Sequence, residues 1–464
     1  MPLHRKKLIA GAVDCDLYAS HAMRVTIPKY KMTAEGVRPD VAFHLVNDEL
    51  MFDGNARQNL ATFCQTWFDD EIHKLMDLSI DKNMIDKDEY PATAEIEDRC
   101  VHIIANLWNA PLAGDTIGCS TTGSSEAAML AGLALKWRWR QSRQRAGLPA
   151  GKPNIVTGPV QICWEKFARY FDVELREIPL ERGRYFNTAE KVLEYVDENT
   201  IGVVCTFATT FTCQYEPVAD VAAALDRLEV ERGLDIPIHV DAASGGFVAP
   251  FIPPEAAWDF RLKRVHSINA SGHKYGLAPL GVGWVVWREK RNLPDELIFR
   301  VNYLGGEMPT FALNFSRPGG QVICQYYLML RLGSEGYRAI HENCYNVAAY
   351  AADNLRGMNR FDVIFDGNPR SGIPAVSWTF AEGQAPYSLF DLSDRLRIRG
   401  WQVPAYTLPK DADDVTVMRI LVRHGFSRDM ADRLLEDIHD ADKYLLAHPQ
   451  PAPNETKRDL AFTH

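Results

Sequence analysis

The sequence lacks several features that would assign it to a specialised class of protein. No uninterrupted apolar run approaches the roughly 18 to 20 residues of a membrane-spanning helix, so we expect no stable insertion in a membrane. Basic residues are in the minority: 51 Lys and Arg stand against 61 Asp and Glu. The resulting net charge of -10 argues against nucleic acid as a partner, because such binding rests mainly on a basic surface.

The N-terminal apolar run and the cysteines exclude further classes. The run Leu8–Val13 is short and meets Asp14 and Asp16, so no secretory signal is predicted. The chain has nine cysteines, an odd number, and no two of them have Cys-x-x-Cys spacing. A disulfide framework or a zinc site is therefore not expected. We expect instead that the cysteines are reduced thiols in a cytoplasmic protein.

Signature motifs of common enzyme classes are missing as well. Gly151-Lys152 is followed by Pro153, which excludes a phosphate-binding P-loop. Gly281-Val282-Gly283 lacks the third glycine of a dinucleotide fingerprint. The motifs His-Glu-x-x-His and Gly-x-Ser-x-Gly do not occur, which argues against zinc proteases and serine hydrolases.

What is present is the pattern of a large α/β protein. Of the 464 residues, 46% are hydrophobic and 24% are charged, as in ordinary globular proteins, and the length predicts two to three domains. Short β-branched runs alternate with helical patterns, which predicts a mostly parallel sheet covered on both faces. The predicted strands are Ile155–Thr157, Ile201–Thr206, Ile236–Val240, Val265–Asn269 and Val282–Trp287. The predicted helices between or before them are Glu95–Trp108, Ala127–Arg145, Thr188–Val196 and Val218–Val230.

Beyond residue 345 this alternation weakens, and a smaller α+β domain is predicted. Its predicted elements are the helix Asn346–Arg356, the strands Gly372–Phe380 and Asp414–Leu421, and the helices Leu389–Arg399 and Asp429–Leu446. We therefore expect an N-terminal arm (1–57), a large α/β domain (58–345), a small domain (346–447) and a flexible C-terminal tail (448–464).

The first candidate for chemistry is the run Thr121-Thr122-Gly123-Ser124-Ser125-Glu126, directly before the predicted helix that starts at Ala127. A glycine and hydroxyl groups at a helix N-terminus offer free backbone N–H groups, hydroxyl donors and the positive end of the helix dipole. Such a site suits a phosphate. Taken alone, ordinary N-capping is the commoner reason for Ser and Thr at this place.

The second and third candidates are an aspartate and a lysine at the ends of two predicted strands. Asp241 is followed by small residues that leave room beside it, and ligands gather beyond the carboxyl ends of parallel strands. Its carboxylate therefore suits a cationic ring nitrogen. The alternative is an ordinary aspartate in a turn. Lys274 comes 33 residues later (274 − 241), one β-α-β step along the sheet. Desolvation there would lower its pKa and make the amine nucleophilic enough for a Schiff base, whereas an isolated lysine is usually solvated.

A phosphate site, a carboxylate for a pyridinium and a Schiff-base lysine together meet the needs of pyridoxal 5′-phosphate. The segments Gly123–Glu126, Gly158–Trp164, Asp241–Gly246 and Ser271–Lys274 resemble pyridoxal-phosphate group II decarboxylases. Asp53–Phe63, Asn314–Pro318 and Arg399–Pro404 narrow the resemblance to the bacterial glutamate decarboxylases, over about residues 40 to 446.

The resemblance implies a fold-type-I, aminotransferase-like architecture and a role for each matching residue. Lys274 becomes the lysine that binds the cofactor aldehyde, and Asp241 the partner of the ring nitrogen. Ser124 and Ser125 hold the phosphate, and His273 assists them.

Further residues around the ring follow from the same resemblance. Gln161 covers one face of the ring and Ala243 packs against the other, while Thr210 faces the cofactor. Ser316 of the partner subunit reaches the phosphate, which makes a homodimer the minimal active unit. Residues 1–35 do not match the amphipathic N-terminal helix of the family's acid-dependent hexamers, so larger homo-oligomers and acid-dependent membrane recruitment are left open.

The expected reaction is the conversion of L-glutamate to 4-aminobutyrate and CO2, with one proton consumed per turnover. Thr62, Phe63 and Asn83 match positions that bind the distal carboxylate of glutamate. Asp86, three residues after Asn83, is expected on the same helical face and near that end.

Proton consumption suggests a role in acid resistance, and the tail fits that role. Its last residue, His464, resembles the histidine of the family's C-terminal plug, which caps the site at neutral pH. Disordered termini are common, so a frayed tail without a role is the alternative.

Two other interpretations of the whole chain stay open. The first is a decarboxylase for another amino acid such as aspartate or tyrosine, and the second is a catalytically silent relative that acts as a scaffold.

Overall fold

The computed structural model describes residues 30–32, 34, 36–111, 116–302, 308–381 and 386–448. The chain divides into two compact units, Met1–Asn55 and Ala56–His464. The first unit contains the helix α1 (Pro39–Leu50), which buries none of its side chains. Among the helices in the described ranges, none has the length and apolar character needed to cross a bilayer.

The second unit is built on a seven-stranded sheet with the strand order β1-β7-β6-β5-β4-β2-β3. The strands are β1 (Ile117–Thr121), β2 (Asn154–Thr157), β3 (Glu174–Glu177), β4 (Thr200–Thr206), β5 (Ile238–Asp241), β6 (Val265–Ser271) and β7 (Gly283–Trp287). β7 is antiparallel to both β1 and β6, and the other pairings are parallel. The predicted mostly parallel sheet is confirmed.

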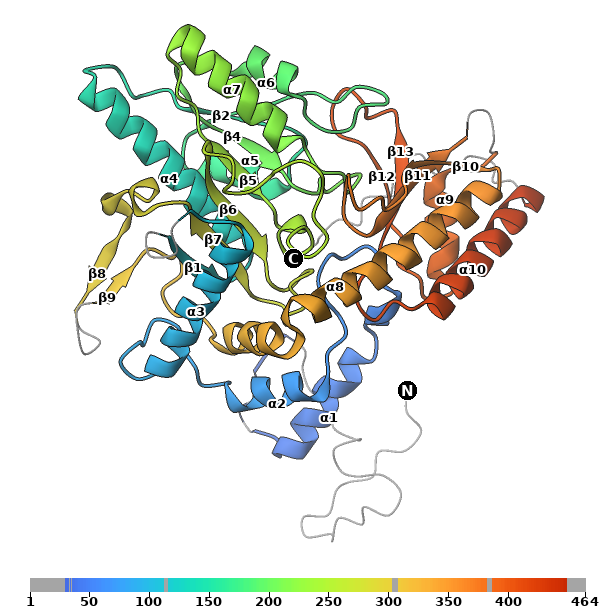
Figure 1. Cartoon of the computed structure of the whole chain (residues 1–464). Coiled ribbons are helices and arrows are strands. Elements are labelled where there is room, and N and C mark those ends of the chain that lie inside the picture. The colour runs from blue at the N-terminus through green and yellow to red at the C-terminus, as the bar shows by residue number, and fades with distance from the viewer. Residues whose placement is uncertain are drawn as a thin grey trace. The chain divides into compact units, whose positions relative to one another are not determined.

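Helices cover both faces of this sheet (Figure 1). Val203 and Val204 are neighbours on β4, and their side chains point to opposite faces. Val204 belongs to a buried cluster with Leu135 and Phe167, and Val203 to a second cluster with Leu225. The helices concerned are α3 (Pro91–Leu107), α4 (Ser124–Arg145), α5 (Ile162–Tyr170), α6 (Ala189–Tyr195) and α7 (Val218–Arg232), whereas α2 (Asp70–Leu78) packs against the later helix α8 (Gly320–Gly357).

Two strands of this sheet lack the β-branched apolar run from which the other strands are predicted. β3 has the sequence Glu-Leu-Arg-Glu and forms one edge of the sheet, where charged residues are tolerated. β1 forms the other edge and contains Gly118 and Ser120 in place of a β-branched run. The predicted strand Ile236–Val240 begins later, at Ile238, because Pro237 has no N–H to donate.

The C-terminal part of the same unit holds a second sheet, which is antiparallel with the order β10-β11-β13-β12. Its elements are β10 (Phe361–Phe365), β11 (Ala375–Phe380), β12 (Ala405–Thr407), β13 (Thr416–Leu421), α9 (Leu389–Arg397) and α10 (Arg428–Ala447). The helices α9 and α10 lie side by side (Figure 1). A small two-stranded sheet, β8 (Phe299–Val301) with β9 (Met308–Thr310), lies between the two parts in sequence.

The helix predicted at Asn346–Arg356 is only the last part of a much longer one. α8 runs from Gly320 to Gly357, with non-helical backbone at Gly333 (φ 56°). This glycine supplies the positive φ at which the regular helix is interrupted. The predicted division between a large and a small domain, at residue 345, falls inside α8 and stays a prediction.

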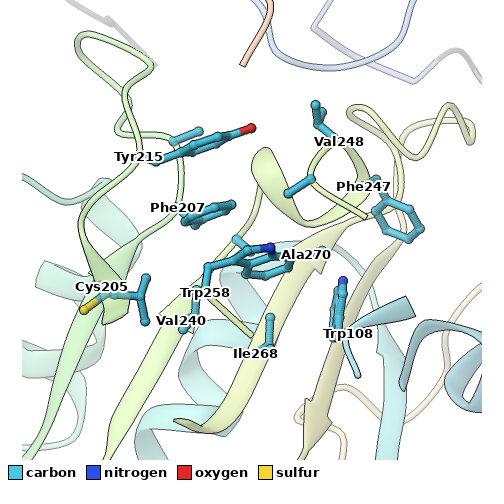
Figure 2. Close-up of a cluster of buried hydrophobic side chains, with 14 of the residues drawn as sticks. Trp108, Cys205, Phe207, Tyr215, Val240, Phe247, Val248, Trp258, Ile268 and Ala270 are labelled. Carbon is cyan, nitrogen blue, oxygen red and sulfur yellow. The ribbon is translucent and has the colours of Figure 1, made fainter. Parts of the chain in front are cut away.

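An aromatic stack supports the segment that follows β5. The Phe207 ring lies between Tyr215 (centroids 3.9 Å apart) and Trp258 (4.5 Å), as Figure 2 shows. Trp108 donates from Nε1 to the carbonyl of Gly246 at 2.9 Å. A Cβ on Gly245 would lie 2.6 Å from the Phe207 carbonyl oxygen. Small residues therefore follow Asp241 because the chain packs directly on these rings.

Candidate active site

The start of α4 forms a cradle for an anion. Its N-cap residue is Gly123, which has no side chain to bond the N–H groups of the first turn. Gly283 on β7 approaches this turn closely, since a Cβ there would lie 2.6 Å from the backbone nitrogen of Ser124. Ser124 and Ser125 thus stand in the first turn, not before it as predicted. Because neither is the cap, capping does not account for their hydroxyls.

Two groups from the end of β6 line the same cradle. Ser271 donates from Oγ to Ser124 Oγ at 2.7 Å. His273 accepts at Nδ1 from the backbone N–H groups of Val282 (3.2 Å) and Gly281 (3.4 Å). Burial, with the charge of Lys274, lowers the pKa of His273 to about 4. At neutral pH the ring hydrogen is therefore on Nε2, which is a donor suited to a phosphate oxygen.

Asp241, the last residue of β5, is a buried carboxylate that accepts three hydrogen bonds from described residues. Its Oδ1 accepts from the backbone N–H of Ala243 (3.1 Å) and from Asn269 Nδ2 (3.1 Å). Its Oδ2 accepts from Trp164 Nε1 at 2.8 Å. A carboxylate has about four lone-pair positions, so the bonds from the described residues leave one further position, on Oδ2. A protonated ring nitrogen fits that position.

A buried histidine supports this carboxylate from behind. His239 Nε2 contacts Asn269 Oδ1 at 2.7 Å, and Nδ1 contacts Ser267 Oγ at 2.8 Å. Burial lowers the pKa of His239 to about 4, against the opposite effect of the Asp241 charge. The ring is therefore neutral, and it orients Asn269 toward Asp241.

Lys274 lies one strand away from Asp241 and three residues past the end of β6. Its Nζ donates to Ser244 Oγ at 3.3 Å and lies 4.8 Å from the centre of the Phe63 ring. Burial lowers the pKa of Lys274, against the Asp241 charge, which raises it. This is the direction that the sequence analysis expects for an amine nucleophile.

Two arginines that sequence analysis missed hold the segment of Thr62 and Phe63 over the lysine. Arg419 on β13 donates to the carbonyls of Ala61 (3.0 Å) and Thr210, and its Cζ lies 4.5 Å from the Phe63 ring centre. Arg423 bonds the segment at three points, the carbonyls of Asn59 and Cys64 and Thr66 Oγ1. The available signal is two arginines four residues apart, one within an apolar strand and one just after it, because buried charges need partners.

Asn83 and Asp86 are placed with Ser316. Asn83 donates from Nδ2 to Asp86 Oδ2 (2.8 Å) and to Ser316 Oγ (3.4 Å), and its Oδ1 accepts from the backbone N–H of Arg317 (3.1 Å). The expected helical face is wrong. Residues 83–86 form a turn closed by the N–H of Asp86 on the Asn83 carbonyl, because Asn83 uses its side chain to bond nearby backbone.

The other predicted residues occupy varied places. Gln161 is the N-cap of α5, where its side chain accepts from the N–H of Cys163 at 2.7 Å, and it is exposed in the single chain. Ala243 accepts from the N–H of Ser271 at its carbonyl, beside Asp241. Thr210 is half-buried next to Arg419. His464 lies outside the described residues.

The cradle, the open position on Asp241 and the buried lysine fit pyridoxal phosphate. Residues 29–380 match the family described as the pyridoxal-dependent decarboxylase conserved domain. The chain belongs to this family. It is therefore a pyridoxal-phosphate-dependent carboxy-lyase of fold type I, as expected. The bound cofactor supplies a ring that accepts the electron pair released when the carboxylate leaves.

Relatives from several organisms agree with this assignment. A glutamate decarboxylase of Aliivibrio fischeri is 58% identical over 465 residues, covering 100% of both chains. A glutamate decarboxylase of Petunia hybrida is 49% identical, covering 94% of this chain and 90% of its own. The structure of a Lactobacillus brevis glutamate decarboxylase matches with a TM-score of 0.89 and 47% identity, over 94% of this chain and 99% of that one. The resemblance to bacterial glutamate decarboxylases is confirmed.

Proposed function

We propose that this decarboxylase acts on L-glutamate, which it converts to 4-aminobutyrate and CO2. The observation that carries the proposal is the 58% identity to a glutamate decarboxylase along the whole of both chains. At this level of identity the pocket that selects the substrate is expected to keep its chemistry, not only its fold.

The charges beside Lys274 support an acidic substrate. The Arg419 guanidinium is 6% exposed, and its Nε is buried with no hydrogen-bond partner among the described residues. A buried guanidinium with a donor left over favours a carboxylate, which it bonds more strongly than it bonds carbonyl groups. We assign to Arg419 the pairing with one carboxylate of the substrate. Phe63, in contact with both cations, excludes water from the same side.

In this proposal Lys274 carries the cofactor, Asp241 keeps the ring nitrogen protonated, and Ser124, Ser125 and His273 hold the phosphate. Gln161 and Ala243 bound the two faces of the ring, and Thr210 faces it. Fixing the substrate at its far end sets which bond at Cα stands perpendicular to the ring, and so which bond breaks. Thr62 has that role on the Lys274 side.

We propose a homodimer whose active sites are shared between subunits. The resemblance implies that Ser316 serves the neighbouring subunit's phosphate site. Asn83 contacts Ser316 and Asp86, so these residues would enter that site as one unit. The distal carboxylate of glutamate would then lie between Thr62 of one chain and Asn83 of the other.

Because each turnover takes up one proton, we propose that the enzyme works in the cytoplasm and contributes to acid resistance. His464 is proposed to limit activity at neutral pH. Deleting residues 450–464 should then retain activity at neutral pH, and an unchanged pH profile would contradict this role.

The test of the reaction is a spectrum of the purified, cofactor-loaded protein before and after glutamate, with product analysis. We expect a Schiff-base absorption band, 4-aminobutyrate and CO2 in equal amounts, and far slower release of amine from aspartate or tyrosine. Lys274→Ala should abolish turnover and the Schiff-base band together. Amine release from aspartate or tyrosine at the rate seen with glutamate would refute the substrate, and normal turnover by Lys274→Ala would refute the site.

A further inference from the structure

A cavity of about 200 Å³ lies at the end of the large sheet opposite to Lys274, where β5 and β6 begin. The helix α4 passes along β6 and β7 toward this place (Figure 1). The wall combines residues from α4, from the starts of β5 and β6, and from the segment after β7. Its charged members are Arg138, Asp235, Lys263, Arg288, Glu289 and Arg291.

Both carboxylates in this wall already have partners. Asp235 accepts from Arg264 at 3.1 Å, and Arg264 also pairs with Asp226. Glu289 pairs with Arg291 and, at 3.7 Å, with Arg288, and it also caps the short helix that follows β7. Four cations stand against two carboxylates in the wall, so the cavity has an excess of two positive charges. This contrasts with the chain as a whole, whose net charge is -10.

Two of these cations have no acidic partner in the part of the chain that the structure describes. Arg138 is half-buried and contacts His266 at Nδ1 through a guanidinium nitrogen, which is a bond to a neutral ring. Lys263 is exposed at the rim of the cavity and forms no ion pair with a described residue.

The pKa of His266 reflects the positive electrostatic potential around the cavity. Burial, together with the charges of Arg138, Arg264, Arg288 and Arg291, lowers the pKa of His266 to about 3. Burial also lowers the pKa of Arg138, and the charge of Arg291 adds to this effect, against the charges of Asp235 and Glu289, which raise it. A positive potential inside a walled cavity concentrates anions, because the low dielectric of the wall strengthens the attraction.

A second cavity of about 380 Å³ adjoins the cationic one, and the two share Arg138, Asp235 and His266 in their walls. The apolar part of its lining includes Trp139, Leu148, Leu234, Ile236 and Pro237. The same lining also carries Arg143, Asp197 and Glu198, and Asp197 pairs with Arg176 at 2.9 Å. The second cavity therefore offers an apolar wall beside charged groups of both signs, next to the cationic cavity.

We propose that the joined cavities bind a small organic phosphate, with the phosphate in the cationic cavity and the apolar or aromatic body against Trp139. A phosphate monoester carries nearly two negative charges at neutral pH, which matches the excess of two positive charges in the wall of the cationic cavity. Guanidinium groups also match the geometry of phosphate oxygens. This site is separate from the cofactor cradle, which is at the other end of β6.

The test is calorimetric titration of the cofactor-loaded enzyme with phenyl phosphate and inorganic phosphate. Loading with the cofactor fills the cradle at α4, so the remaining phosphate binding reports the second site. We expect saturable binding of phenyl phosphate and weaker binding of inorganic phosphate. Arg138→Gln should weaken phenyl phosphate about tenfold, because one charge-assisted bond is lost.

The controls separate this site from general charge effects. Lys263→Gln, at the exposed rim, should weaken binding without any risk to folding, whereas Arg140→Gln removes the same charge from α4 outside the cavity and should leave binding unchanged. Binding that is absent, that is equal in Arg138→Gln and the unaltered enzyme, or that is no tighter for phenyl phosphate than for inorganic phosphate would overturn the proposal.

Discussion

Combining two defective subunits tests whether each active site is shared between chains. One subunit carries Lys274→Ala, and the other carries Asn83→Ala with Ser316→Ala. The second change removes the bond from Asn83 to Asp86 (2.8 Å) and the bond it accepts from Arg317 (3.1 Å). At about 1 kcal/mol or more per bond, kcat/KM of its homodimer should fall about 10- to 100-fold.

The heterodimer should recover activity that neither parent has. If Asn83 and Ser316 serve the neighbouring site, one site combines an intact Lys274 with intact Asn83 and Ser316, and the other site has both defects. Heterodimers isolated with two affinity tags should therefore show about half of the activity of the unaltered dimer. The assay is 4-aminobutyrate release per dimer at glutamate concentrations well below KM, with saturating cofactor.

A second heterodimer provides the control. Lys274→Ala combined with Asp241→Ala should stay inactive, because these residues end adjacent strands of one chain and serve one site. Activity of the first heterodimer no higher than that of its more active parent would refute a shared site. It would place Asn83 and Ser316 in the site of their own chain.

Three further changes test the site and the stability of the fold. Trp164→Phe removes one donor from Asp241 and should weaken cofactor binding about tenfold, read from absorbance titration; unaltered affinity would contradict the anchor. Gly283→Ala brings a methyl group to 2.6 Å from Ser124 N, so we expect cofactor loss and about 1–3 kcal/mol of destabilisation; full cofactor occupancy would contradict the close approach. Burial lowers the pKa of His341 to about 4, so as the pH falls the unfolded chain binds a proton at this residue before the folded chain does. The stability that is present above about pH 6.5 is therefore lost as the pH falls toward 4. By pH 5 this costs roughly 2 kcal/mol, and urea denaturation of His341→Gln should show a shallower loss than the unaltered protein, whereas equal pH dependence would contradict it.

The sequence predicts the part of the site that depends on strand ends. Asp241 and Lys274 follow apolar runs that are recognisable as strands, and parallel pairing brings the ends of β5 and β6 to one edge. Ser124 is likewise found from a glycine before a long helical pattern. These positions follow from local pattern and a general rule of topology.

The contacts that hold residues 59–66, the segment containing Thr62 and Phe63, could not be predicted in the same way. Arg419 and Arg423 contact residues 59–66 across more than 350 positions of sequence, and no local pattern pairs the two segments. The turn at Asn83–Asp86 was read as a helix because spacing alone does not show a side chain bonding its own backbone. Edge strand β3 was missed because it buries too little to show a pattern.

The way in which Asp241 is held explains how one carboxylate would act on both the ring nitrogen and Lys274 in the proposed site. Its three donors in the described part of the chain are neutral, from Trp164, Asn269 and a backbone N–H, so its negative charge is oriented but not cancelled. A buried arginine in their place would neutralise the field that reaches Lys274. The charge of Asp241 raises the pKa of Lys274 against the stronger effect of burial. With that field removed, the pKa of Lys274 would fall further, and a ring nitrogen beside Asp241 would have no negative charge to keep it protonated. Neutral donors at this position thus preserve both effects at once.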